Sequence, residues 1–312
     1  MTNSVRTIIL SLAATTALMG AARAEVPDAC KTVTMSDVGW TDITTTTAMT
    51  KHILEGLGYS VDVKVLSVPV TFASLEKGDV DVFLGNWMPS QGAAIDPYLK
   101  AGQIDDLSVN LEGTKYNLAV PTYVYDEGLK SYQDLPKFKD QLEGKIYGIE
   151  PGNEGNDYLI GLTQKADSGL QGYEVVESSE QGMLAMVGRA YKQDKPIVFL
   201  GWEPHPMNAN FDLKYLQGGQ DFFGGEGQVH TVTRKGYAED CQNVATFLKN
   251  EKFSLDMENR IMGQILDDGE DAGDATEAWL KANPDQWEGW LEGVTTVDGE
   301  PGLPAVKTSL GM

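Results

Sequence analysis

Two nearly matching stretches, VFLGNWMPS (82–90) and VFLGWEPHP (198–206), stand more than a hundred residues apart in the chain. Each runs Val-Phe-Leu-Gly and then reaches a tryptophan, Trp87 in the first copy and Trp202 in the second. The apolar run predicts a short buried strand that the glycine ends. The chain is therefore expected to build, twice, a strand that delivers a tryptophan at its end.

Strands and helices alternate before the first copy. The predicted strands are 32–36, 61–65 and 80–84, and the predicted helices are about 44–57 and 72–77. Apolar spacing of three to four residues indicates the helices, and alternation or a short apolar run indicates the strands. The β-α-β-α-β order is typical of a mainly parallel sheet flanked by helices.

The same plan restarts around the second copy. The predicted strands are 145–149, 173–176 and 196–200, and the predicted helices are about 156–165 and 179–192. The remaining residues mix one strand, 229–233, with helices at 240–249, 256–267 and 276–282. The sequence thus predicts two α/β units followed by a mainly helical tail.

The first 24 residues are expected to be a signal peptide. The apolar run TIILSLAATTALMGA is too short to span a bilayer comfortably, and Ala22-Arg23-Ala24 supplies the small residues that a signal peptidase requires. Its removal takes two arginines and no acid, so that the formal net charge changes from −22 to −24. We expect an exported protein that repels nucleic acid and anionic membrane surfaces.

The two cysteines, Cys30 and Cys241, are expected to form a disulfide bond because an exported protein meets an oxidising compartment. By loop closure, this bond adds roughly 5 kcal/mol to the stability, and two free thiols are the alternative. A bond between them places the tail with the first unit. The chain then crosses between two lobes twice, near 111–115 and near 207–212, and two crossings make a hinge. The expected division is a signal peptide, 1–24, a first lobe, 25–112 plus 209–312, and a second lobe, 113–208.

Three of the six tryptophans, Trp40, Trp87 and Trp202, follow predicted strands. Ligands of open α/β sheets bind beyond the C-terminal ends of the strands, so we expect these rings to face the cleft between the lobes. A single such tryptophan is better explained by packing, whereas three at equivalent strand ends are harder to attribute to packing alone. The other three, Trp279, Trp287 and Trp290, have a spacing that suits packing of the tail.

Indole rings are the best aromatic partners for a cation. Three or four rings around one cation supply roughly 6–8 kcal/mol before ordering costs, and micromolar affinity requires about 8 kcal/mol. A quaternary ammonium has no N–H group and therefore suits ring faces better than a primary ammonium does. Asp42 is able to add charge or accept a hydroxyl hydrogen bond, although capping of the following helix explains it equally well.

Six motifs in combination resemble the choline and glycine-betaine substrate-binding proteins of ABC importers, over essentially the whole mature chain. They are GWTD (39–42), LGNWMP (84–89), KYNLAVP (115–121), PGNEGND (151–157), FLGWEPHPMN (199–208) and WLKANPDQWEGWLEGV (279–294). The resemblance implies a two-lobed periplasmic binding protein of the type II-like α/β class. Each lobe is then a mainly parallel sheet flanked by helices, and two hinge crossings allow closure on a ligand.

The resemblance also implies the residues of the ligand site. An aromatic box around a trimethylammonium group would consist of Trp40, Trp87, Tyr116 and Trp202. Asp42 and Asn153 would hold the hydroxyl end of choline. Tyr116 and Asn153 are indicated by the resemblance alone, since composition and spacing do not single them out. The implied partner is the membrane permease of an ABC importer, and we expect a monomer with no cofactor and no metal.

Two other classes of function stay open as alternatives. A binder of glycine betaine or proline betaine would need donors for a carboxylate, and the turn at 152–156 is able to offer amides. An enzyme is disfavoured because the sequence lacks the G-x-S-x-G, H-E-x-x-H, G-x-G-x-x-G and P-loop motifs. His205 is expected to hold its turn, and pH-sensitive ligand release is the alternative role.

Overall fold

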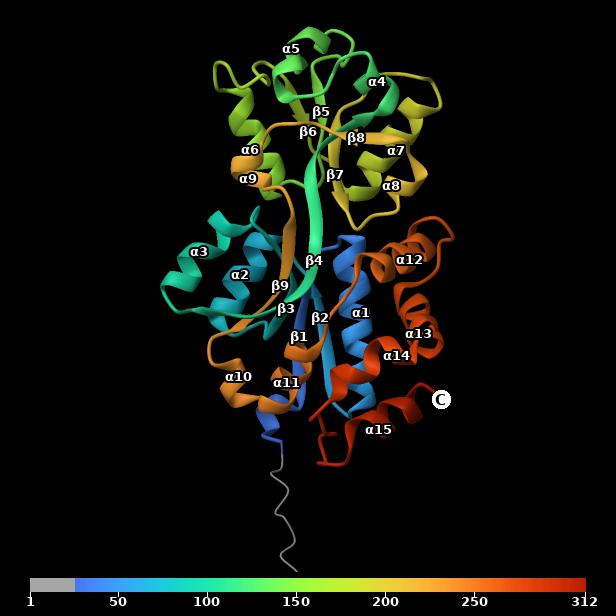
Figure 1. Ribbon diagram of the computed structural model, residues 1–312. Helices are drawn as coiled ribbons and strands as arrows, with labels where there is room; N and C mark the ends of the chain where they lie inside the picture. The colour runs from blue at the N-terminus through green and yellow to red at the C-terminus, as the bar shows by residue number, and fades with distance from the viewer. Residues whose placement is uncertain (1–25) are drawn as a thin grey trace, which may run out of the picture.

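The computed structural model describes residues 26–312, and the predicted signal peptide, residues 1–24, lies outside the described residues. Figure 1 shows two α/β bodies joined along the long strand β4 (Ile104–Pro121). The N-terminal part of β4 pairs with β9 (Gly227–Arg234), and the C-terminal part pairs with β7 (Phe199–Glu203). One strand therefore takes part in both sheets, and the predicted two-lobed α/β architecture is confirmed.

The first sheet has the strand order β2-β1-β3-β9-β4. Strand β1 (Thr32–Asp37) pairs in parallel with β2 (Ser60–Val65) and β3 (Val82–Met88), whereas β9 runs antiparallel to β3 and β4. This sheet and its helices form the body that we call lobe one. Its helices are α1 (Thr41–Gly56), α2 (Val68–Lys77), α3 (Gly92–Lys100), α10 (Tyr237–Asp240), α11 (Gln242–Asn250), α12 (Leu255–Leu266), α13 (Ala272–Ala282), α14 (Pro284–Trp287) and α15 (Gly302–Ser309).

The second sheet continues from the C-terminal part of β4 in the order β4-β7-β5-β6, and β8 (Leu213–Tyr215) pairs with the other side of β4. Strands β5 (Lys145–Tyr147) and β6 (Glu174–Val176) run parallel to each other. This sheet and its helices form lobe two. Its helices are α4 (Thr122–Asp126), α5 (Leu135–Phe138), α6 (Glu154–Thr163), α7 (Glu180–Tyr191), α8 (Met207–Asn210) and α9 (Gln220–Phe223).

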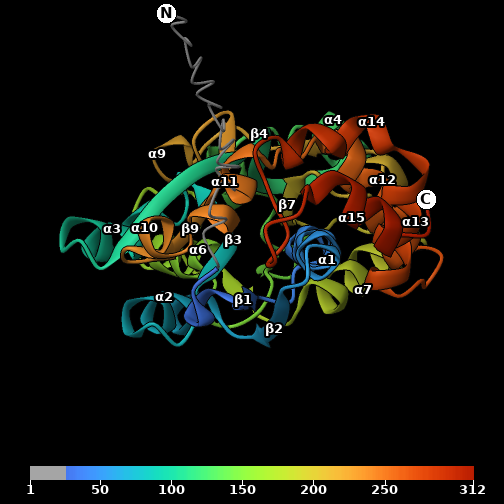
Figure 2. The ribbon, with the colours of Figure 1, turned by 90° about the horizontal axis from the view of Figure 1, so that it is seen from below.

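The C-terminal helices belong to lobe one. Helix α1 packs against α12, α13 and α15, and Figure 2 shows α1 nearly end-on with these helices beside it. The Cys30–Cys241 disulfide bond joins residues 211 positions apart, and both cysteines are buried. The predicted disulfide is therefore confirmed, and it holds the C-terminal part of the chain to lobe one. Within residues 26–312, no helix combines the length and the apolar character needed to cross a membrane.

The return to lobe one comes later than the predicted crossing near 207–212. Strand β8 still pairs with Ala119–Pro121 of β4, in the sheet of lobe two. The backbone of this segment is held there at both ends, because Thr122 donates to the Asp212 carbonyl and Leu216 donates to the Leu118 carbonyl. The next strand along the chain, β9, pairs with β3 of lobe one.

The two tryptophan-bearing strands extend further than predicted. The glycines were expected to end them, but β3 and β7 both continue through their tryptophans. Gly85 and Gly201 allow close packing instead. A Cβ atom at Gly85 would approach the Ile43 side chain to 2.8 Å, and one at Gly201 would approach the Ala119 Cβ to 3.0 Å. These glycines therefore let neighbouring side chains press against the middle of each strand.

Candidate functional site

Lobe one contributes two tryptophans and a carboxyl group to the space between the lobes. Trp40 directly precedes α1, Asp42 lies in the first turn of α1, and Trp87 lies on β3. Strands β1 and β3 are parallel neighbours, so that their C-terminal ends meet at one edge of the sheet. There, Trp87 Nε1 donates to Asp42 Oδ2 at 3.0 Å.

Lobe two contributes a second pair of rings. Trp202 on β7 lies opposite Tyr116 on β4, and residues paired in this way project to the same face of a sheet. The two ring centroids are 6.5 Å apart, with an interplanar angle of 87°. Tyr116 also contacts Trp87 of lobe one, with centroids 6.3 Å apart and an angle of 64°. Tyr116 therefore bridges the tryptophans of the two lobes.

Asn153 holds the beginning of α6 and orients Tyr116. As the N-cap residue of α6, it accepts hydrogen bonds at Oδ1 from the backbone N–H groups of Gly155 and Asn156, at 2.9 and 3.3 Å. The same oxygen accepts a 3.0 Å hydrogen bond from the Tyr116 hydroxyl group. The predicted turn is thus a helix cap whose side chain reaches the aromatic rings.

The structure brings the six residues of the resemblance to one cavity between the lobes. The empty space among these side chains, counted together with the adjoining open solvent, is about 330 Å³. Four further lining residues were not predicted from the sequence. The complete lining is Trp40, Asp42, Trp87, Ser90, Gln91, Tyr116, Ile149, Asn153, Glu154 and Trp202.

Asp42 lines this cavity and has a buried side-chain oxygen with no hydrogen-bond partner. Its side chain is 1% exposed, and Oδ1 accepts no hydrogen bond while Oδ2 accepts from Trp87. Burial, and secondarily the charge of Glu180, raise the pKa of Asp42 to about 8. A positive charge in the cavity would therefore lower the pKa of Asp42 and favour its ionised form.

Glu154 presents a second such group from the opposite lobe. It follows Asn153 in the first turn of α6, and its Oε1 is buried with no hydrogen-bond partner. Burial raises the pKa of Glu154 to about 7, with a smaller contribution from the charges of Glu150 and Asp157. The only sequence signal for it is its place beside Asn153 in PGNEGND, where an acidic residue is ordinary at a helix start.

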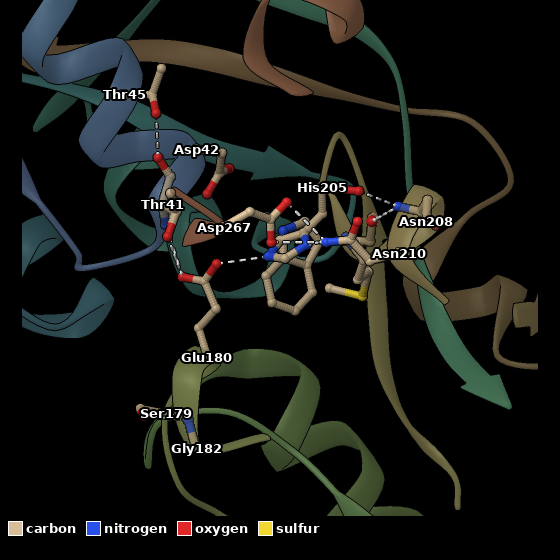
Figure 3. Close-up of polar contacts among 12 residues, drawn as sticks. Thr41, Asp42, Thr45, Ser179, Glu180, Gly182, His205, Asn208, Asn210 and Asp267 are labelled. Carbon is tan, nitrogen blue, oxygen red and sulfur yellow. Dashed lines mark hydrogen bonds and ion pairs between the residues drawn. The ribbon is translucent and has the colours of Figure 1, made fainter. Parts of the chain in front are cut away.

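Hydrogen bonds join the two lobes beside the cavity. Trp40 Nε1 donates to Glu150 Oε1 at 2.9 Å, and the backbone N–H group and hydroxyl group of Thr41 donate to Glu180 Oε2 at 2.9 and 3.0 Å. Figure 3 shows Glu180 reaching from α7 toward the start of α1. The two lobes are therefore in contact at Trp40 and Thr41, beside the part of the cavity that lobe one forms.

His205 lies next to this contact. Its Nδ1 accepts a 2.9 Å hydrogen bond from the backbone N–H group of Met207, as expected for a residue that holds its turn. Its ring also contacts Trp202, with centroids 4.8 Å apart and an interplanar angle of 78°. His205 therefore does not line the cavity but packs against Trp202, which does.

The tail tryptophans pack in lobe one, as predicted. Trp287 is fully buried, and its Nε1 donates to the Leu280 carbonyl at 2.8 Å. Trp290 packs edge-on against Phe253, with centroids 5.6 Å apart. The third, Trp279, is partly buried against the same core. The tryptophans of this chain thus divide into three that line the cavity and three that stabilise the tail.

The sequence is similar to one protein-family model and to a characterised relative. The model for the substrate binding domain of the ABC-type glycine betaine transport system matches residues 31–282. The glycine betaine/proline betaine-binding periplasmic protein of Salmonella typhimurium is 23% identical, over 91% of this chain and 96% of its own sequence.

Two solved structures share the fold at higher sequence identity. An ABC-transporter choline-binding protein in complex with choline is 57% identical and superposes with a TM-score of 0.89, covering 91% of this chain and 100% of that one. An ABC-transporter choline-binding protein in an unliganded semi-closed conformation gives a TM-score of 0.84 at the same identity and coverage. The TM-score is thus higher for the choline-bound structure than for the unliganded one.

Proposed function

The chain belongs to the family of substrate-binding domains of ABC-type glycine betaine transport systems, and from this premise we propose that it captures choline between its lobes. Members of this family bind a transported substrate and are not enzymes. Rings from both lobes, Trp40 and Trp87 on one side and Tyr116 and Trp202 on the other, would surround the trimethylammonium group. Asp42 and Asn153 would hold the hydroxyl end.

The acidity of the cavity is the observation that carries this proposal. Asp42 and Glu154 face it from opposite lobes, and each has a buried oxygen without a partner. No lysine, arginine or histidine is among the described residues that line it. Aromatic rings and carboxyl groups together favour a methylated cation, because the rings attract a charge that has no N–H group to donate.

Glycine betaine or proline betaine is the alternative ligand, and the family and the Salmonella relative favour it. A betaine brings a carboxylate, which requires hydrogen-bond donors. The amides of Gly155 and Asn156, which the turn is able to offer, already donate to Asn153. A betaine carboxylate would also lie near two carboxyl groups. These contacts favour choline.

The proposed role extends to the transport cycle. Membership of an ABC transport family supports a membrane permease as the partner that receives the ligand. We propose that the mature protein works in the periplasm, as its Salmonella relative does, after removal of residues 1–24 as a signal peptide. It would act as a monomer, since one chain supplies both halves of the cavity, and its net charge disfavours nucleic acid as a partner.

Calorimetric competition tests the choice of ligand. We expect choline to bind with a micromolar or lower Kd, and glycine betaine to bind at least about tenfold more weakly. Ethanolamine, which has the same hydroxyl group and charge but no methyl groups, is the control and is expected to bind far more weakly than choline. Tighter binding of glycine betaine would favour the alternative ligand, and equal binding of ethanolamine would contradict the aromatic box.

The raised pKa values of Asp42 and Glu154 predict a pH-dependent affinity. Choline carries a fixed positive charge, so that its binding favours the ionised carboxyl groups and lowers their pKa values below about 8 and about 7. Binding then releases protons, and protons compete with choline as the pH falls. We expect the Kd to be roughly tenfold higher at pH 6 than at pH 8.5.

Titrations in two buffers of different ionisation enthalpy measure the released protons directly. The carboxyl groups that face Asp42 are Glu180 and Glu258, and those that face Glu154 are Glu150 and Asp157. These neighbouring carboxyl groups do not need to be mutated, because the measurement gives the total number of protons released on binding. A Kd that stays constant from pH 6 to 8.5, with no proton release, would contradict this assignment.

A further inference from the structure

Helix α1 begins without a cap of its own. The N-cap residue is Trp40, whose side chain has no acceptor for a hydrogen bond and caps nothing. The first N–H groups of any helix require acceptors from outside the helix, and Ser, Thr, Asp or Asn normally supplies one at this position. Because Trp40 lines the cavity and is unable to cap α1, another group has to accept hydrogen bonds from the first N–H groups of this helix.

Lobe two supplies that group. Glu180 Oε2 accepts both the backbone N–H group and the hydroxyl group of Thr41, at 2.9 and 3.0 Å. Glu180 Oε1 lies 2.8 Å from His205 Nε2, and because His205 Nδ1 accepts from Met207, the proton of the neutral ring lies on Nε2. Glu180 and His205 are each about 1% exposed, and Figure 3 shows the chain of contacts from α1 to His205.

We propose that Glu180 is a positioning residue for ligand retention, which caps α1 across the cleft only when the lobes are closed. The proposal rests on the proposed function, since it assumes a ligand held between the lobes. Thr41 stands between Trp40 and Asp42, and both of these residues line the cavity. A bond made to Thr41 by the other lobe therefore fixes the helix start that carries two of the ligand-contacting side chains.

The charge of Glu180 makes its contact with Thr41 favourable in the closed form. A carboxylate at the start of a helix is stabilised by the partial positive charge of the unpaired N–H groups. Separation of the lobes by more than a hydrogen-bond length removes this stabilisation and exposes both partners to water. His205, fixed by Met207, holds the carboxylate in the required orientation. The contact thus favours the closed form and slows its opening.

The same charge opposes closure around an empty cavity. Glu180 adds to the burial that raises the pKa values of Asp37 and Asp42, so its charge repels theirs across the contact, and it also raises the pKa of Glu150 within lobe two. A cation in the cavity offsets this repulsion. Glu180 therefore supports closure on a cationic ligand more strongly than closure without one.

Stopped-flow measurement of choline dissociation, by the fluorescence of the cavity tryptophans, tests the proposal. In E180A, we expect the dissociation rate to rise about tenfold while the association rate changes less than about twofold, because the contact forms after the ligand enters. E180Q keeps an acceptor for Thr41 without the charge and is expected to show an intermediate rate. E174Q, which removes an exposed carboxylate of β6 in the same lobe, is the matched control and is expected to retain the wild-type rate.

A merely structural role predicts another pattern. It would lower the Tm of E180A and leave the choline dissociation rate at the E174Q value, and that result would overturn the proposal. If E180A does not fold, the rate of E180Q decides in the same way. If the wild-type protein does not bind choline, the proposed function fails, and amide exchange at Thr41 still tests the cap. Exchange at Thr41 that is equally slow in wild-type protein and E180A would then overturn the proposal.

Discussion

Replacement of Trp202 with alanine is expected to weaken choline binding roughly tenfold or more, and isothermal titration calorimetry measures this loss directly. Trp202 is 4% exposed and lines the cavity, and its ring lies nearly perpendicular to that of Tyr116. Removing the ring deletes one of the four aromatic walls. It also takes away the ring against which His205 packs, so that the lobe-two side of the cavity loses support.

Two variants separate loss of the ring from loss of the fold. W202F retains an aromatic face and is expected to recover part of the affinity. W279A removes a tryptophan of α13 that packs against the core of lobe one and does not line the cavity. We expect W279A to lower the Tm and leave the Kd for choline unchanged. An unchanged Kd in W202A would remove Trp202 from the box.

Much of the fold was predictable because local patterns decide it. The apolar runs that lead to Trp87 and Trp202 form buried strands, and α7 buries Met183, Val187 and Ala190 at helical spacing. The glycines in these strands were misinterpreted as strand ends. Their purpose is to admit Ile43 and Ala119, which are distant in sequence and therefore cannot be inferred from the strand alone.

Strand β4 was not predicted, and its sequence explains why. It has 18 residues, and its pattern of burial changes along its length, because its first part lies in lobe one and its last five residues are all buried in lobe two. A single period does not describe both environments. The later return of the chain, after β8, has the same origin, since β8 is held by backbone hydrogen bonds to β4.

The acidic residues that lobe two adds to the site were also out of reach of the sequence. Glu154 and Glu180 each lie in the first turn of a helix, where acidic residues are common and usually hydrated. Their burial depends on the opposite lobe, and Thr41 and Glu180 are 139 positions apart in the chain. The rings, in contrast, follow strand ends, and strand ends are a place where ligand sites recur.

We propose that the cavity recognises a positive charge rather than an apolar shape. The neutral carbon isostere of choline, 3,3-dimethyl-1-butanol, has the same methyl groups and the same hydroxyl group but no charge. It retains the burial of apolar surface and loses the attraction of the rings and of the ionised carboxyl groups of Asp42 and Glu154.

Calorimetric titration of the ligand-free protein with choline and with this isostere, at pH 8.5, is the most direct test. We expect the isostere to bind roughly a hundredfold more weakly than choline, because several cation–ring contacts of about 0.5–1 kcal/mol or more each are lost with the charge. Affinities for the two compounds that agree within about twofold would show that the site selects shape alone, and would contradict the account.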